Sequence, residues 1–162
     1  MRVRLRVQTK VCRFGREERG TQLVELAIVL PLLVVLFASV AEFGRYLYTY
    51  TTLAKATRSG ARYLATAQDT ADEDARTKNL VVYGNFGGTG DPLLDGLTTG
   101  NVSVTRQAAT PTSGGTVKVK IDGYVFRPLF DLGALTGRKD FSLRVSVAPA
   151  TTMRYLLTQP FF

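Results

Sequence analysis

The stretch Arg19–Arg45, RGTQLVELAIVLPLLVVLFASVAEFGR, decides how this chain is organised. Residues 26–41 carry no charged side chain, and extending the segment back to residue 23 adds a single acid, Glu25. A helix needs about 20 residues to cross the hydrocarbon core of a bilayer. The segment from about 23 to 41 is therefore long enough to span a membrane, and the acid near its start needs an explanation.

Basic residues gather immediately before the apolar segment. The first 20 residues hold seven Lys and Arg side chains and two Glu, in a chain of 162 residues with 21 basic and 13 acidic groups. A basic head followed by an apolar run is typical of a targeting segment or of the cytoplasmic flank of a membrane anchor. No nucleic-acid partner is expected, because the basic excess lies in this head rather than on a folded face.

The helical pattern continues beyond the apolar segment. After Glu42, residues recur at steps of three and four and predict one amphipathic stripe that faces the rest of the protein: Phe43, Leu47, Tyr50, Ala54, Thr57, Ala61 and Leu64. Pro31 should bend the helix, which spanning helices tolerate. We predict one helix from about Gln22 to Ala67 and a short second helix at about Thr70–Val82, capped by Asp69-Thr70.

The distal part alternates between apolar and polar residues in three places, near 101–105, 116–125 and 141–147. These are predicted to be strands, and the loop 110–115 joins the first two as a hairpin. In the second strand, Val117, Val119 and Ile121 share one face, with Lys118 and Lys120 on the other. A small antiparallel sheet with one apolar face needs a packing partner, and the stripe of the long helix is the expected one.

The predicted fold class is therefore α+β. It comprises a basic leader (1–20), a long helix (21–67) whose first half spans the membrane at about 23–41, and an extracytoplasmic α+β domain (68–162). The second half of the helix is amphipathic and packs on the sheet. About 95 residues beyond the helix make only a small core, which we expect to depend on that packing for stability.

The residue types present exclude several kinds of chemistry. The chain has no His, and its one Cys, Cys12, lies in the basic head. Ser–His and Cys–His pairs, His metal ligands and an intrachain disulfide are thereby excluded. The glycine-rich Gly87–Gly90 lacks the Lys and the strand-to-helix context of a phosphate-binding loop, so we interpret it as a turn. We expect no enzyme activity, cofactor, metal site or small-molecule substrate.

The surroundings of Glu25 resemble the processing motif of type IV pilins. In Gly20-Thr21-Gln22-Leu23-Val24-Glu25, a Gly follows the basic leader and a Glu lies five positions after it. The continuation VELAIVLPLLVVLF, then EFGR at Glu42–Arg45 and SGARYLA at Ser59–Ala65, is similar to the TadE-like family of pilin-like proteins, found in tight-adherence (Flp, type IVb) pilus systems. The resemblance covers roughly the first 65 residues and is weaker through Leu80–Asn85 and the β-rich tail.

The resemblance implies a role for each of these residues. A prepilin peptidase would cut after Gly20 and leave Thr21 with a free α-amino group. Glu25 of one subunit would pair with that amine on a neighbour and fix their register, because an unpaired buried charge is costly. Glu42 and Arg45 would mark the far membrane boundary, where we expect a local ion pair between residues three apart.

The resemblance also implies a function. Flp-type pilins are essentially a helix alone, so the β-rich domain favours a minor pilin or pseudopilin that primes or caps a pilus used in adhesion or secretion. Its partners would be the prepilin peptidase, sister minor pilins, the filament pilin, the assembly platform and membrane lipid. The chain would cross the cytoplasmic membrane once, with its N-terminus in the cytoplasm and its C-terminal domain outside, or be extracellular within a filament.

Two other interpretations of the N-terminal segment stay open. A secretory signal peptide cut after Ser39-Val40-Ala41 would release a domain beginning at Glu42. A plain uncleaved anchor would hold the same domain at the membrane, with Glu25 reaching into the headgroups. In either case the chain would be an envelope binding module rather than a pilus component.

Overall fold

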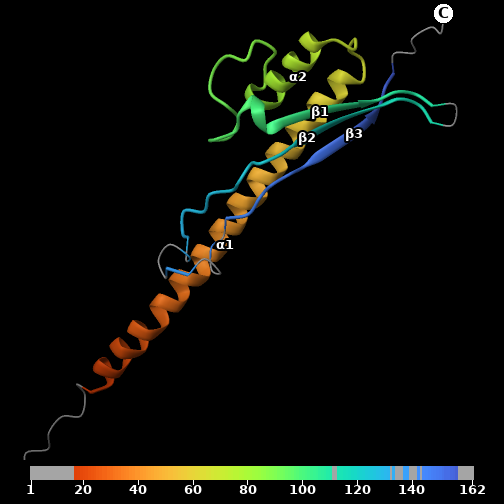
Figure 1. Ribbon diagram of the computed structural model, residues 1–162. Helices are drawn as coiled ribbons and strands as arrows, with labels where there is room; N and C mark the ends of the chain where they lie inside the picture. Colours follow the sequence, from red (N-terminus) through yellow and green to blue (C-terminus); the bar gives the residue numbers. More distant parts are fainter. Residues whose placement is uncertain are drawn as a thin grey trace, which may run out of the picture. The chain divides into compact units, whose positions relative to one another are not determined.

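The computed structural model describes residues 17–110, 113–131, 133, 137–138, 142 and 144–156. Its elements are α1 (Glu17–Leu64), α2 (Ala71–Tyr83), a 3-10 helix η2 (Thr99–Asn101), and the strands β1 (Val102–Gln107), β2 (Thr116–Ile121) and β3 (Ala150–Arg154). The predicted α+β class is confirmed (Figure 1). The chain divides into two compact units at Val40 and Ala41, and α1 contributes to both. Residues 1–16 of the predicted leader lie outside the described part.

In the first unit, the described residues are the apolar start of α1. The side chains of residues 21–37 are all exposed, and apart from Thr21, Gln22 and Glu25 they are apolar on every side of the helix. A helix of this kind is suited to a lipid environment, and by length and composition this one can cross a membrane. Pro31 lies inside α1 without ending it. The helix begins at Glu17, earlier than the predicted Gln22.

In the second unit, α1 ends at Leu64 rather than at the predicted Ala67. The amide of Ala65 still bonds to the carbonyl of Ala61 at 3.0 Å, whereas that of Thr66 bonds to the carbonyl of Tyr63 at 3.1 Å, which is the i→i−3 spacing of a tightened last turn. The second helix is confirmed to within one residue. Thr70 is its N-cap, with the side-chain hydroxyl accepting from the Glu73 amide, and Gly84 closes it in the left-handed conformation at φ 73°.

The helices α1 and α2 approach each other closely at Gly60. A Cβ atom added there would lie 2.7 Å from Cγ2 of Val81 and 3.2 Å from Cγ2 of Thr77, both in α2. Glycine weakens a helix interior by about 1 kcal/mol relative to alanine. Here its missing side chain lets α2 pack against α1.

The sheet has the order β1-β2-β3 with both pairings antiparallel. Two predicted strands are present, at 102–107 and 116–121, joined by the predicted hairpin. The third was wrong in position, because β3 lies at 150–154. Of the predicted strand, residues 141 and 143 lie outside the described residues, and residues 144–147 form only an isolated bridge, between Ser146 and Val125.

The third strand escapes a search for alternation because its inner face is partly polar. Thr151 occupies a position on β3 that faces α1, and its hydroxyl lies 3.2 Å from that of Thr57. Thr57 is itself fully buried. The pair satisfies two hydroxyls at the helix–sheet contact, so a polar residue is accepted where the pattern requires an apolar one.

The sheet packs on the second part of α1, as predicted (Figure 1). The core joins β2 side chains to α1 side chains: Val117, Val119 and Ile121 with Leu53, Ala56, Ala61 and Leu64. The outer face of β2 carries Lys118. The distal half of the predicted helix stripe and the predicted faces of β2 are therefore correct.

The proximal half of the predicted stripe was wrong. Phe43, Leu47 and Tyr50 are 62, 44 and 44% exposed, whereas Glu42 and Thr49 are buried. These two sets lie on adjacent faces of the helix, about 100° apart. The structure buries the more polar face because Glu42 finds hydrogen-bond partners there, and it leaves an apolar face uncovered.

Candidate functional site

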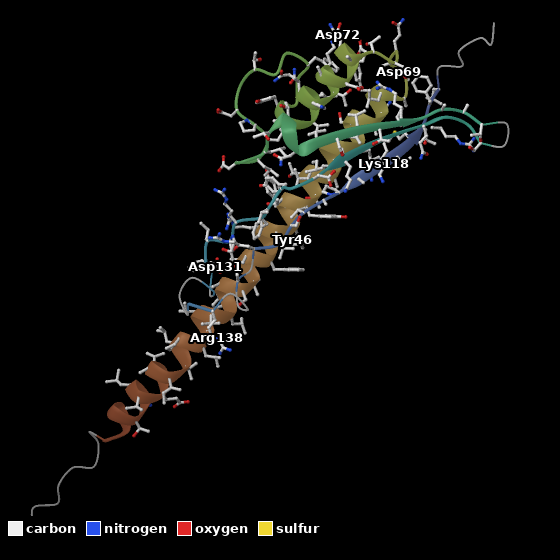
Figure 2. The ribbon with its side chains drawn as sticks, viewed as in Figure 1. Tyr46, Asp69, Asp72, Lys118, Asp131 and Arg138 are labelled. Atoms are coloured by element: carbon white, nitrogen blue, oxygen red, sulfur yellow. The ribbon has the colours of Figure 1, made fainter. Side chains whose placement is uncertain are left out.

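Between β2 and β3 the chain makes a long excursion beside α1. Its two arms are held together by backbone hydrogen bonds from the Phe126 amide to the Val145 carbonyl and from the Val147 amide to the Tyr124 carbonyl, each 2.9 Å. The turn of the excursion begins with residues 127–131, which we call the 127–131 loop. Figure 2 shows Asp131 of this loop beside the stretch of α1 that contains Tyr46.

The loop is fixed to α1 by Glu42. This carboxylate is only 5% exposed. Its Oε1 accepts hydrogen bonds from the backbone amides of Leu129 at 2.7 Å and Phe130 at 3.1 Å. Two amide donors on one carboxylate oxygen make charge-assisted bonds, which are stronger than neutral ones. Glu42 thus joins two segments that are 87 residues apart in the sequence.

Arg45 completes the charge balance of this site. Its Nη1 lies 3.2 Å from both carboxylate oxygens of Glu42, so the predicted ion pair between residues three apart is present. The same guanidinium lies 5.6 Å from the centre of the Phe126 ring. The Phe126 ring also meets Tyr46 edge to face, with centroids 5.7 Å apart. These ring contacts add to the attachment of the excursion to α1.

The carboxylate of Asp131 bonds to groups of the excursion itself. Asp131 accepts from the Gly133 amide at 3.0 Å, from the Ser142 hydroxyl at 3.3 Å and from Arg144 Nε at 3.2 Å. Its side chain is 13% exposed. The two apolar residues before it behave in the opposite way, because Leu129 is 72% and Phe130 51% exposed. The loop is therefore held by its polar groups and presents its apolar side chains outward.

This arrangement attaches the loop to the helix. Glu42 is occupied by three donors, the Arg45 guanidinium and the amides of Leu129 and Phe130. Within the described residues, no group of three His, Cys, Asp or Glu side chains could hold a metal ion. What the site can do is fix an exposed apolar loop at a set position on the helix.

The other predicted site residues lie in the first compact unit. Gly20, Thr21 and Glu25 are in α1, and all three are exposed. Nothing lies within 4 Å of the position a Cβ of Gly20 would take. None of the described residues forms an ion pair with Glu25. The processing role of Gly20 and Thr21 and the registration role of Glu25 stay predictions.

A second polar cluster, at the far end of α1, was missed from the sequence. The Tyr63 hydroxyl donates to Glu73 of α2, and Arg76 lies 3.6 Å from the same carboxylate. The hydrogen bond to Glu73, together with burial, raises the pKa of Tyr63 above its ordinary value. On β1, the Arg106 side chain forms ion pairs with Asp69 and Asp74. These contacts fasten α2 and the sheet to the end of α1.

Comparison with known proteins bears on α1 alone. Residues 20–62 match the family described as TadE-like protein. No match was found among curated proteins or among solved structures. The matched segment contains Glu25, Glu42, Arg45 and Gly60, and it starts at the predicted processing glycine. Over this segment the chain is similar to the TadE-like family, and the resemblance predicted from its sequence is confirmed there.

Proposed function

We propose that this chain is a minor pilin or pseudopilin of a tight-adherence, type IV-like pilus. It would be a structural protein that performs no reaction and that primes or caps assembly of the filament. The observation that carries the proposal is the continuity of α1 from Glu17 to Leu64, within which residues 20–62 are TadE-like. One helix therefore supplies both the candidate membrane span and part of the core of the α+β unit.

The start of α1 supports processing and register. Cleavage by a prepilin peptidase after Gly20 would leave the α-amino group of Thr21 one helical turn from Glu25. An acid inside a lipid-exposed helix is costly unless it meets a cation. The amine of Thr21 on a neighbouring subunit is a suitable partner, and pairing would fix the axial position of adjacent helices.

The uncovered face of α1 supports packing with sister subunits. Phe43, Leu47 and Tyr50 lie on one side of the helix and are not covered by the sheet. Large apolar side chains aligned on a helix are typical of a helix–helix contact. Glu42 and Arg45 would lie where the span ends, at the external surface of the cytoplasmic membrane.

Partners and location follow from the same argument. Besides the peptidase, the chain would contact sister minor pilins, the filament pilin, the membrane assembly platform and lipid. It would cross the cytoplasmic membrane once, with its N-terminus in the cytoplasm and the α+β unit outside, and it could pass from there into a filament.

The decisive experiment is an intact-mass measurement on the full chain purified from membranes, with and without a co-expressed prepilin peptidase. The proposal expects Thr21 as first residue only with the peptidase, and it expects Gly20→Leu to remain uncut. A chain that starts at Glu42 would identify a secretory signal peptide. Met1 retained in the presence of an active peptidase would identify a plain anchor.

Assembly is tested separately with Glu25→Gln, which keeps the shape of the side chain and removes its charge. The variant should be inserted and processed normally, yet it should not be recovered with sister pilins after cross-linking. Normal recovery would refute the pairing role of Glu25 and leave the processing result untouched.

A further inference from the structure

We infer that the 127–131 loop is a second membrane contact, in which Leu129 and Phe130 enter the interface of the outer leaflet. The inference rests on the proposed membrane anchoring by α1 and adds a separate surface to it. The occupant of this surface is the lipid bilayer itself. The argument has three parts, which concern the level of the loop, the exposure of its side chains and the charge around them.

The level of the loop is set by Glu42. The uncharged run 26–41 ends one residue before this carboxylate. A span of this length leaves the hydrocarbon core near residue 41. Because the amides of Leu129 and Phe130 bond directly to Glu42 at 2.7 and 3.1 Å, the loop backbone lies at the level of the span's end. The boundary of the bilayer is therefore where these two residues are held.

The contacts of the 127–131 loop keep the side chains of Leu129 and Phe130 exposed. Leu129 is 72% exposed and Phe130 51%, while their backbones are tied to Glu42 and the next residue, Asp131, is tied to Arg144. The polar groups thus keep two adjacent large apolar side chains outside the core. Interfacial lipid is the environment that accepts such side chains, since aromatic and aliphatic groups there leave water without losing the hydration of nearby polar groups.

The charge around the loop favours lipid headgroups over a protein partner. Arg127 precedes the two apolar residues and is exposed. Arg144 on the returning arm is also exposed, but its charge is balanced by the ion pair with Asp131. The one acid among residues 127–131, Asp131, is largely buried and paired. Two exposed apolar side chains preceded by the positive charge of Arg127 suit a leaflet that contains anionic lipid, because a basic group near such a surface is attracted to it.

The test uses the full chain in vesicles of phosphatidylethanolamine and phosphatidylglycerol. In a Cys12→Ser background, a polarity-sensitive fluorophore is attached at Leu129→Cys or Phe130→Cys. The matched control is Leu156→Cys, because Leu156 is equally exposed at 68% but bonds to Ala65, about 35 Å further along α1. A label at Phe37→Cys reports whether α1 itself is in the bilayer. Quenching by lipids spin-labelled near the headgroup is then measured at each position.

The inference expects a blue shift and a loss of fluorescence at 129 and 130, stronger with the shallow than with a deep spin label, and neither effect at 156. Quenching at 37 with the 129 and 130 labels behaving like 156 would overturn the loop contact and leave the anchor intact. Absence of quenching at 37 as well would overturn both. A blue shift at 129 and 130 that spin-labelled lipid does not quench would show a protein partner and would also overturn the inference.

Discussion

Replacing Glu42 by alanine tests whether one carboxylate holds the 127–131 loop on α1. The change leaves the amides of Leu129 and Phe130 without their acceptor. Leaving a buried amide donor without an acceptor costs about 1–3 kcal/mol of folding free energy. The loop is at the surface, so water can reach one of the two amides when the loop opens. We therefore expect the free energy of local opening of the loop to fall by about 2–3 kcal/mol. That is a roughly 30- to 150-fold fall in the protection of these two amides against hydrogen exchange.

The assay is hydrogen exchange on the full chain in nanodiscs, with the amide of Val119 in β2 as the reference for global opening. Glu42→Gln keeps one acceptor oxygen and should give an intermediate loss. Arg45→Ala removes a partly exposed ion pair worth at most about 1 kcal/mol and should leave both loop amides protected. Unchanged exchange at 129 and 130 in Glu42→Ala, or equal deprotection in Arg45→Ala, would refute the reasoning.

Three further predictions concern the packing of α1 and α2, and the first two are read from urea unfolding followed by circular dichroism. Gly60→Ala should destabilise the fold by about 1–3 kcal/mol, because the new Cβ would lie 2.7 Å from a side chain of α2. The control Gly44→Ala, with nothing within 4 Å of the new Cβ, should stabilise it by up to about 1 kcal/mol. Equal effects of the two substitutions would contradict the close approach of α1 and α2 at Gly60. Thr70→Ala should lose about 1 kcal/mol through the missing N-cap, and Thr70→Ser should restore it. Since the hydrogen bond to Glu73 raises the pKa of Tyr63, the stability it contributes is complete below the unfolded pKa of about 10 and is lost as pH rises through the folded value. Phenolate absorbance should lose one late-titrating step in Tyr63→Phe, and an unchanged high-pH titration would exclude the bond.

Much of the fold could be predicted because its determinants are local. The long apolar and amphipathic run predicts α1, and the polar cap at Thr70 predicts α2. Alternation predicts β2, together with the face that meets α1. The third strand could not be found this way, because Thr151 is accepted on the inner face only through its hydroxyl partner on α1.

In the candidate site, too, the local contact could be predicted from the sequence and the distant one could not. The ion pair of Glu42 with Arg45 follows from a spacing of three on a helix, so it could be predicted. The bonds from Glu42 to the amides of Leu129 and Phe130 could not, because nothing local relates a helix residue to a loop 87 positions later. The error in the helix stripe has the same origin. Phe43 belongs to the more apolar face, and only the distant loop makes the face of Glu42 the buried one.

The attachment of the 127–131 loop to Glu42 also has a mechanical consequence. Ala41 is the first residue of the second compact unit, so a pull on the preceding segment enters that unit beside Glu42. Its bonds to Leu129 and Phe130 would be loaded before the helix–sheet core that begins at Leu53. The excursion between β2 and β3 would then detach from α1 first, while the three-stranded sheet stays folded.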